Sequence, residues 1–261
     1  ASVARILLEP AGRNTAAAMI SAALMPGVAN TDLLLFVPSD HFVPDIDAFI
    51  ETMQSGVDAA REGYIVTFGV QPNFPSTAYG YIQQSSCLED ISIGASSTYA
   101  VERFVEKPPA GKAKEMLLSG NYLWNAGIFL CQASVLKSAL HQHALDILTS
   151  SQVAMQSAQV DGDFVRPDSE SFLACRSESI DYAVMEHTKH ACVTPADIGW
   201  SDVGTWRAVV TSFAVSGVRR RPSIACRFLW LNASWRITAV RASMICRSLW
   251  MTSTPQMKTA R

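Results

Sequence analysis

The apolar run Leu33–Val37, followed at once by Pro38, Ser39, Asp40 and His41, constrains this chain more than any other stretch. Five consecutive apolar residues without alternation are typical of a strand buried on both faces, which is usual in the parallel sheets of α/β proteins. Ligands of such sheets bind in the crevice outside the carboxyl ends of the strands. The sequence therefore places Asp40 where a carboxylate stays ionised and can hold a divalent cation.

The remaining apolar pattern alternates between strand and helix up to the loop around Asp202. Strands are expected at residues 6–8, 64–70, 79–82, 98–105, 123–130 and 191–194, and helices at residues 16–24, 45–61, 112–118, 134–156 and 179–187. Strands separated by helices of this length indicate βαβ units and a mostly parallel sheet, so we expect an α/β fold. A chain of 261 residues with 49% hydrophobic content is long enough for one such domain and an appendage.

Charge is divided unevenly along the chain. All 23 acidic residues lie at or before Asp202, whereas residues 203–261 carry ten of the 21 basic ones. Solvated domains usually intersperse both signs. The last residues also lack a helix or strand period. We therefore predict a domain over residues 1–212 and a basic tail over residues 213–261.

The cysteines and the hydropathy pattern favour a reducing compartment. The six cysteines are dispersed, without a CxxC pair or the spacing of metal ligands. No basic and apolar leader precedes the first strand, and no apolar run is long enough to span a bilayer. We expect a cytoplasmic protein that binds neither membrane nor nucleic acid, and the sequence leaves a homo-oligomer open. The first strand follows Ala1 so closely that we expect a start inside a domain.

Polar groups at other strand ends extend the candidate site. Asp202 resembles Asp40 in its setting, and two lone carboxylates on strand-end loops suggest a metal clamp for phosphate chemistry. Near the N-terminus, a strand-to-helix turn exposes Arg13, Asn14 and Thr15 together with free backbone N–H groups. Such a turn suits an anion or the edge of a nucleobase, although ordinary helix capping by Asn14 explains it equally well.

Further motifs point to a sugar phosphate. Gly80 lies in a strand and allows a ligand close to the backbone, although a bulge is the simpler reading. Glu106 and Lys107 end another strand and suit sugar hydroxyls and a phosphate; a solvated strand end is the alternative. Asn125 beside Trp124 is a combination found in sugar pockets, and the alternative is a core tryptophan with a turn-forming asparagine.

Together and in this order, the motifs resemble bacterial mannose-1-phosphate guanylyltransferases, which are sugar nucleotidyltransferases. The resemblance covers residues 3–210 and rests on LEP with GRNTA, PSDH, YGYI, FVEKP, WNAGIF, SIDYAVME and GWSDVGTW. It implies a Rossmann-like three-layer α/β/α fold with a mostly parallel sheet. It also implies the transfer of GMP from GTP to mannose 1-phosphate, which gives GDP-mannose and pyrophosphate.

The resemblance also implies roles for the candidate residues. Asp40 and Asp202 hold Mg²⁺ between the two substrates, and Lys107 binds the sugar phosphate. Because attack on the α-phosphorus is in line, positioning and charge neutralisation supply most of the catalysis. The remaining substrate-binding residues are Glu106 and Asn125 at the sugar hydroxyls, Gly80 beside the sugar, and Arg13, Asn14 and Thr15 on the nucleotide side.

Histidine is not expected to act as a base here. His41 follows the metal aspartate, but the phosphate nucleophile is already ionised at neutral pH. We therefore expect His41 to orient its neighbours. His187 and His190 lie near a helix end without a third ligand, which predicts surface positions.

The chain departs from the family pattern at its start. Family members begin with a strand and a Gly-rich loop, carrying Arg and Lys, that holds the triphosphate; no such motif occurs here. Removal of one such donor costs about 3 kcal/mol in related electrostatic sites. We therefore expect this polypeptide to lack the first strand and the Gly-rich loop, to be weak or inactive, and to expose a sheet edge or apolar face. The alternatives are another sugar-1-phosphate nucleotidyltransferase and a non-catalytic remnant that still binds a sugar phosphate.

The tail after residue 212 resembles a change of reading frame more than a designed domain. Arg, Ser and Trp accumulate there without acids or periodicity. A basic tail for nucleic acid or acidic membrane is the rival, but its tryptophans follow no stacking or amphipathic spacing. We predict that the coding DNA, translated in another frame from near codon 213, encodes acidic sequence with strand periodicity. Sequencing checks this, and the absence of such a frame would refute it.

Overall fold

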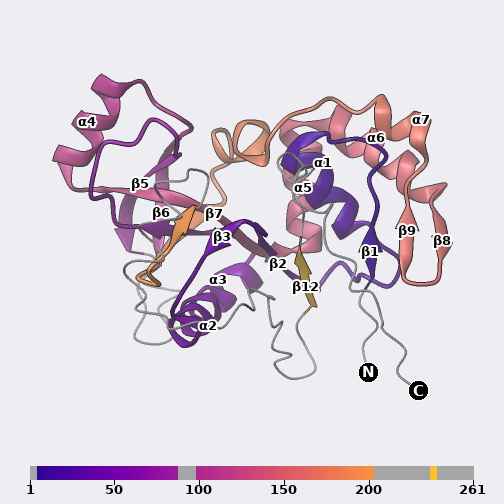
Figure 1. Cartoon of the computed structure of the whole chain (residues 1–261), viewed down its shortest axis with the longest axis horizontal. Coiled ribbons are helices and arrows are strands. Elements are labelled where there is room, and N and C mark those ends of the chain that lie inside the picture. The colour runs from indigo at the N-terminus through magenta and orange to yellow at the C-terminus, as the bar shows by residue number, and fades with distance from the viewer. Residues whose placement is uncertain (1–4, 88–97, 203–235, 240–261) are drawn as a thin grey trace, which may run out of the picture.

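A computed structural model describes residues 5–87, 98–202 and 236–239 of the chain, the last as backbone only. Figure 1 shows its helices and strands. The strands are β1 (Ile6–Leu7), β2 (Leu33–Val37), β3 (His41–Phe42), β4 (Ile65–Val70), β5 (Tyr81–Cys87), β6 (Tyr99–Val105), β7 (Tyr122–Gln132), β8 (Gln159–Asp161), β9 (Phe164–Arg166), β10 (Ala191–Pro195), β11 (Ser201–Asp202) and β12 (Arg236–Ala239). The helices are α1 (Asn14–Ala23), α2 (Ile46–Ser55), α3 (Val57–Arg61), α4 (Ala110–Ser119), α5 (Ala133–His143), α6 (Leu145–Gln156), α7 (Ser169–Leu173) and the π-helix η2 (Asp181–Met185).

The main sheet has the order β12-β2-β7-β4-β10-β6-β5. β4 pairs in parallel with β10, and β2 pairs in parallel with β12. The long strand β7 runs antiparallel between β2 and β4 and also pairs with β5. As a result β2, β4, β5, β10 and β12 point one way, and β6 and β7 point the other. The α/β fold is as expected, but the sheet is mixed: most strands share one direction, whereas only the β4–β10 and β2–β12 pairings of its described strands are parallel.

Strand β2 shows why the fold has three layers. Leu34 and Phe36 belong to a core cluster that includes α1, α5 and α6, whereas Leu33 and Leu35 belong to a second cluster that includes α2 and α3. Successive side chains of a strand point to opposite faces, so both faces of β2 are buried beneath helices. The prediction of a strand buried on both faces is confirmed.

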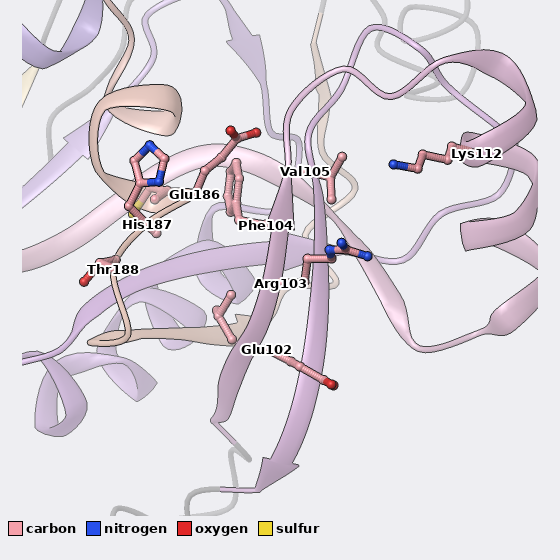
Figure 2. Close-up of a pocket in the computed structure, with 10 residues that line it drawn as sticks. Glu102, Arg103, Phe104, Val105, Lys112, Glu186, His187 and Thr188 are labelled. Atoms are coloured by element: carbon pink, nitrogen blue, oxygen red, sulfur yellow. The ribbon is translucent and has the colours of Figure 1, made fainter. Parts of the chain in front are cut away.

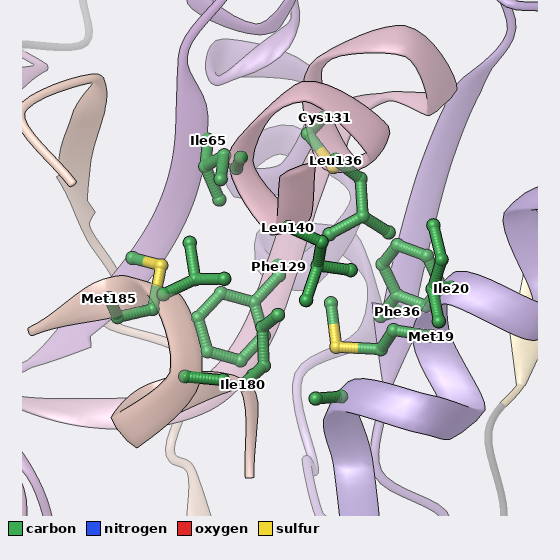
Figure 3. Close-up of a cluster of buried hydrophobic side chains, with 14 of the residues drawn as sticks. Met19, Ile20, Phe36, Ile65, Phe129, Cys131, Leu136, Leu140, Ile180 and Met185 are labelled. Atoms are coloured by element: carbon green, nitrogen blue, oxygen red, sulfur yellow. The ribbon is translucent and has the colours of Figure 1, made fainter. Parts of the chain in front are cut away.

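The larger core cluster joins α1 and α5 to the sheet. Figure 3 shows Ile20 of α1, Leu140 of α5, Phe36 of β2 and Phe129 of β7 in this cluster. Helix α1 is rich in alanine, and the side chains from Ala16 to Ala23 are buried. Short side chains let α1 pack closely on α5 and α6. This packing anchors the turn that precedes α1.

Several elements differ from their predicted form. The expected helix over residues 45–61 is divided at Gly56, and the one over 134–156 is divided at Ala144. Residues 179–187 form only the short π-helix η2. Strand β1 lies outside the main sheet, in a small sheet with β8 and β9. Its two residues are too few to cross the main sheet, and Ile6 is exposed.

The tail contains one strand in the described part, where the sequence pattern predicts none. β12 pairs with β2, with Arg236 opposite Leu34 and Ala239 opposite Val37. This pairing covers the edge of β2, because β12 uses the backbone hydrogen-bonding groups of that edge. The predicted boundary at residue 212 lies outside the described residues. Among the described helices, none is both long and apolar enough to cross a bilayer.

Gly69 provides a test of the sheet packing. A Cβ at Gly69 in β4 would lie 2.6 Å from Leu123 Cδ1 and 2.8 Å from Val193 Cγ2. We predict that Gly69→Ala destabilises the protein by about 1–3 kcal/mol, the usual cost of overpacking a core. The midpoint of thermal unfolding measures this effect. As a control, Gly111→Ala in α4 meets no described atom within 4 Å and is expected to leave the midpoint unchanged or higher. Equal midpoints for wild type and Gly69→Ala would contradict the packing.

Candidate functional site

A cavity of about 220 Å³ gathers most of the predicted site residues. It lies beyond the carboxyl end of β2, as expected for this class of sheet. The predicted residues that line it are Thr15, Gly80, Glu106, Lys107, Asn125 and Asp202. Arg13, Asn14 and Asp40 are the predicted residues that do not line it. Elements from five parts of the chain thus meet at one site.

Asp202 reaches the site through a two-stranded ladder. β11 pairs antiparallel with β3, so that Asp202 lies directly opposite His41. Asp40 is the residue before His41, and it is exposed. The two aspartates that the sequence proposes as a pair therefore lie one position apart across this ladder, although 162 positions separate them along the chain.

A tyrosine holds the Asp202 carboxylate. The Tyr79 hydroxyl donates a hydrogen bond of 2.6 Å to Asp202 Oδ1. Burial and the nearby Asp202 charge raise the pKa of Tyr79, so the hydroxyl stays a donor across the physiological range. The sequence did not predict a role for Tyr79, because the YGY motif indicates only the close backbone approach that Gly80 allows.

His41 is packed against Trp200. The Trp200 indole N–H donates to His41 Nδ1 at 3.0 Å, and the two rings meet edge to face. In neutral imidazole the proton must then lie on Nε2. Burial lowers the pKa of His41, although Asp40 and Asp202 oppose this change. These contacts are those of a side chain that orients its neighbours.

The donor set at this end suits a divalent cation that also binds phosphates. Mg²⁺ prefers one or two carboxylates and fills its other positions with water and phosphate oxygens. Asp40 and Asp202 supply two carboxylates. Across residues 5–87 and 98–202 no group of three or more His, Cys, Asp or Glu side chains forms a metal site. The residues therefore fit Mg²⁺ as a partner of bound phosphate, not as an ion held by protein alone.

Glu106 and Lys107 form an ion pair at the end of β6. Lys107 Nζ lies 3.2 Å from Glu106 Oε1, with the Glu106 side chain 10% exposed and that of Lys107 58% exposed. Lys107 has a φ of +46°, which residues with side chains adopt rarely. The backbone N–H of Glu106 donates to Glu186 Oε1 at 3.1 Å. Burial raises the pKa of Glu106, and Lys107 opposes this change.

Gly80 makes room for the Glu106 carboxylate. A Cβ at this position would lie 2.4 Å from Glu106 Oε2 and 3.3 Å from Asn125 Cβ. The Gly80 carbonyl also accepts from the Asn125 backbone N–H at 2.8 Å. Any larger residue would displace the carboxylate from the cavity wall.

Three partners orient the Asn125 amide. Its Oδ1 accepts from the Thr67 hydroxyl and from the Gly127 N–H, both at 3.0 Å. Its Nδ2 donates to Asp181 Oδ1 at 2.9 Å. The amide nitrogen must therefore face Asp181, because both donors lie on its oxygen side. Asp181 also lines the cavity, and sequence reasoning assigned it no role.

Asp181 is a half-buried acid in this wall. Burial and the nearby Glu106 charge raise its pKa to about 7, while hydrogen bonds from Ser179 and Asn125 oppose the rise. A sequence signal existed in the SIDYAVME motif, where an acid stands within an apolar stretch. Its burial depends on tertiary packing.

The turn before α1 is tied to the segment before η2. Thr15 Oγ1 accepts from the Ile180 N–H at 2.9 Å. Asn14 has a φ of +64°, and its side chain accepts from the next residue, Thr15, at 2.9 Å. The alternative of ordinary capping by Asn14 is therefore wrong, because α1 has Arg13 at its N-cap and no side-chain cap.

Unsatisfied polar atoms remain at this turn. Arg13 Nη2 donates to the Leu173 carbonyl of α7. Within the described part of the chain, Arg13 Nε and Glu9 Oε1 are buried without a hydrogen-bond partner. Burial raises the pKa of Glu9 to about 7. Buried polar groups without partners are uncommon, so these atoms mark a place where a ligand could supply hydrogen bonds.

A second cavity of about 480 Å³ lies beyond the Glu106–Glu186 contact and contains none of the predicted site residues. In Figure 2, Glu186 and His187 lie to one side of Phe104, with Arg103 and Lys112 on the other. His187 and His190 are exposed, as predicted.

Comparison with known proteins agrees with this geometry. Residues 2–215 match the nucleotidyl transferase family model. The chain is 43% identical over 209 residues to the mannose-1-phosphate guanylyltransferase of Escherichia coli, covering 78% of this chain and 43% of that protein. It is 45% identical over 206 residues to the xanthan biosynthesis protein XanB of Xanthomonas campestris, covering 78% and 42%.

A solved structure, titled mannose-6-phosphate isomerase from Helicobacter pylori, is 34% identical with a TM-score of 0.67, covering 75% of this chain and 73% of that one. The chain spans less than half the length of the curated relatives named above. The family model nevertheless matches most of this chain and includes every residue that lines the candidate cavity. The chain therefore belongs to the nucleotidyl transferase family.

Proposed function

We propose that the chain is the nucleotidyltransferase part of a mannose-1-phosphate guanylyltransferase. The observation that carries the proposal is that Asp202 lines the same cavity as Glu106, Lys107 and Asn125. A sugar 1-phosphate and a nucleoside triphosphate require three kinds of group: a carboxylate for the metal, a cation for the phosphate, and hydrogen-bond acceptors and a donor for the hydroxyls. The names of relatives at 43–45% identity support mannose 1-phosphate as the sugar and GTP as the nucleotide.

The reaction needs positioning more than acid–base chemistry. An oxygen of the mannose 1-phosphate attacks the α-phosphorus of GTP in line, and the bond to pyrophosphate breaks. Lys107 neutralises the attacking phosphate and holds it in place. Glu106 and Asn125 bind the sugar. Asp40 and Asp202 are the residues that would hold Mg²⁺, which would neutralise phosphate charge when bound.

Guanine recognition is assigned to the turn before α1. Glu9 presents a buried oxygen without a partner in the described structure. The Watson–Crick edge of guanine offers two adjacent donors, N1–H and the exocyclic amino group, whereas adenine has an acceptor at N1. A carboxylate that accepts from both donors therefore favours GTP over ATP. Arg13, Asn14 and Thr15 on the same turn are proposed to flank the nucleotide.

The proposal keeps the other expectations as predictions. A cytoplasmic location suits an enzyme whose substrates are charged metabolites. No nucleic-acid or membrane partner is proposed, and the oligomeric state is left open.

Isothermal titration calorimetry of this polypeptide tests the function. With Mg²⁺ present, we predict that mannose 1-phosphate binds more tightly than glucose 1-phosphate and that GTP binds more tightly than ATP or dTTP. Glu9→Gln is expected to reduce the preference for GTP over ATP about tenfold, because a good bidentate pair contributes about 1–3 kcal/mol of discrimination. Glu115→Gln, at an exposed position on α4, is the matched control. Tighter binding of dTTP and glucose 1-phosphate would reject the assignment.

A further inference from the structure

The cavity contains one more acid than the proposed reaction explains. Asp181 comes from η2, whereas Glu106 and Lys107 follow β6 and Asn125 lies in β7. All four side chains line the same cavity. Asp181 is distant in sequence from Asp40 and is not needed for the proposed metal pair. Its position beside the Asn125 amide places it at the end of the cavity assigned to the sugar.

The charge pattern at this end suits a ligand with two kinds of group. A site for phosphate alone would be lined with cations and N–H donors. Here the cation Lys107 lies beside Glu106, and both Glu106 and Asp181 raise the pKa of Lys107. Carboxylates accept hydrogen bonds but donate none when ionised, so they suit hydroxyl groups. A molecule that carries a phosphate and several hydroxyls satisfies both.

Hydrogen bonding in the wall leaves Asp181 able to accept more. Asp181 accepts from Asn125 Nδ2 and from Ser179. A carboxylate offers about four lone-pair sites, so capacity remains for a hydroxyl. Because Thr67 and Gly127 bind the Asn125 oxygen, the Asn125 nitrogen keeps a second N–H beside Asp181. A donor and an acceptor thus stand next to each other, as recognition of a sugar hydroxyl requires.

We propose that Asp181 is a sugar-binding residue that acts with Glu106 and Asn125 to hold hydroxyls of the sugar while Lys107 holds its phosphate. This inference rests on the proposed function, because it names the sugar-binding part of that same site. It adds a residue that determines sugar specificity outside the Glu106–Lys107 motif. This residue lies on a helix, so the expectation that ligands bind at strand ends would not identify it.

Proton binding gives the inference a second readout. The acid Glu106 faces Asp181, and the nearby charged or titratable groups are Lys107 after β6, Tyr182 on η2, and Glu186, which contacts Glu106. Two further titratable groups, His143 of α5 and His187, contact each other beyond the other end of η2. With its pKa raised to about 7, Asp181 is partly protonated at neutral pH and ionised above it. The ionised carboxylate accepts the stronger hydrogen bond from a sugar hydroxyl, so affinity for mannose 1-phosphate should rise as pH rises.

Asp181→Asn separates binding from structure. Asparagine has the same shape, and its oxygen still accepts from Asn125 Nδ2, so an acid that only orients Asn125 would be replaced without loss. A hydroxyl acceptor is weakened by the loss of charge, because hydrogen bonds to charged groups are about twice as strong as neutral ones. The matched control is Asp163→Asn, at an exposed position between β8 and β9.

The test titrates mannose 1-phosphate and inorganic phosphate into wild type and both variants at pH 7.0 and 8.5. Mannose 1-phosphate is mainly a dianion at both pH values, and inorganic phosphate is compared between variants at the same pH. For Asp181→Asn we expect mannose 1-phosphate to bind about tenfold more weakly at pH 7.0, with inorganic phosphate unchanged or tighter. In wild type the affinity for mannose 1-phosphate should rise about twofold between the two pH values, because Asp181 goes from about half to almost fully ionised, and in Asp181→Asn this rise should disappear. GTP binding reports whether Asp181→Asn is folded. If this variant no longer binds GTP, Asp181→Ser is used in its place.

The outcomes separate the two proposals. If wild type binds mannose 1-phosphate and Asp181→Asn binds it equally well with the same pH dependence, the role of Asp181 is refuted and the proposed function stands. If Asp181→Asn weakens inorganic phosphate to the same extent, Asp181 acts on the cavity as a whole, and the sugar-binding role is also refuted. If wild type binds no sugar phosphate, both proposals fail together.

Discussion

The pairing of β11 with β3 is the constraint on which the site depends. Only two residues of each strand take part, yet this ladder sets Asp202 opposite His41 and next to Asp40. The loop that follows β10 is held near the end of β2 by this ladder together with the core packing of Ile198 and Trp200. The ladder is reinforced on both sides, because Tyr79 holds Asp202 and Trp200 holds His41. The proposed metal-binding pair, whose residues are so distant in sequence, therefore rests on a few hydrogen bonds.

The end of the cavity that we propose for the sugar is organised by a different principle. There a single amide, that of Asn125, is oriented by Thr67, Gly127 and Asp181. Thr67 is fully buried, so its hydroxyl has no access to water and must bond within the protein. Gly80 leaves the space in which the Glu106 carboxylate lies. One end of the cavity is thus built from acceptors beside a cation, and at the other end Asp202 lines the cavity with Asp40 close by along the ladder.

Much of this arrangement is predictable from the sequence, and the reasons are local. The run Leu33–Val37 has no alternation, and burial on both faces follows directly from that. Asp202, Glu106 and Asn125 stand in motifs at strand ends or inside a strand, where side chains of an α/β sheet converge on a ligand. The antiparallel position of β7 between β2 and β4 was not predictable, because the apolar pattern of a strand does not indicate its direction in the sheet.

The features of the site that the sequence did not predict depend on tertiary contacts. Asp181 and Glu9 acquire raised pKa values only because the folded chain buries them. The role of Tyr79 depends on the approach of residue 202, which no local pattern encodes. Strand β12 was missed because its pairing with β2 joins segments about 200 positions apart.

Paramagnetic relaxation by Mn²⁺ shows whether Asp40 and Asp202 share one cation, because Mn²⁺ replaces Mg²⁺ at sites of hard oxygen ligands. NMR spectra of the ¹⁵N-labelled protein with GTP would be recorded as Mn²⁺ is added. We expect the amide signals of Asp40, His41 and Asp202 to broaden together, and we expect Asp202→Asn to abolish the broadening at all three. Broadening at only one of the two segments, or broadening that survives the substitution, would contradict a shared cation site.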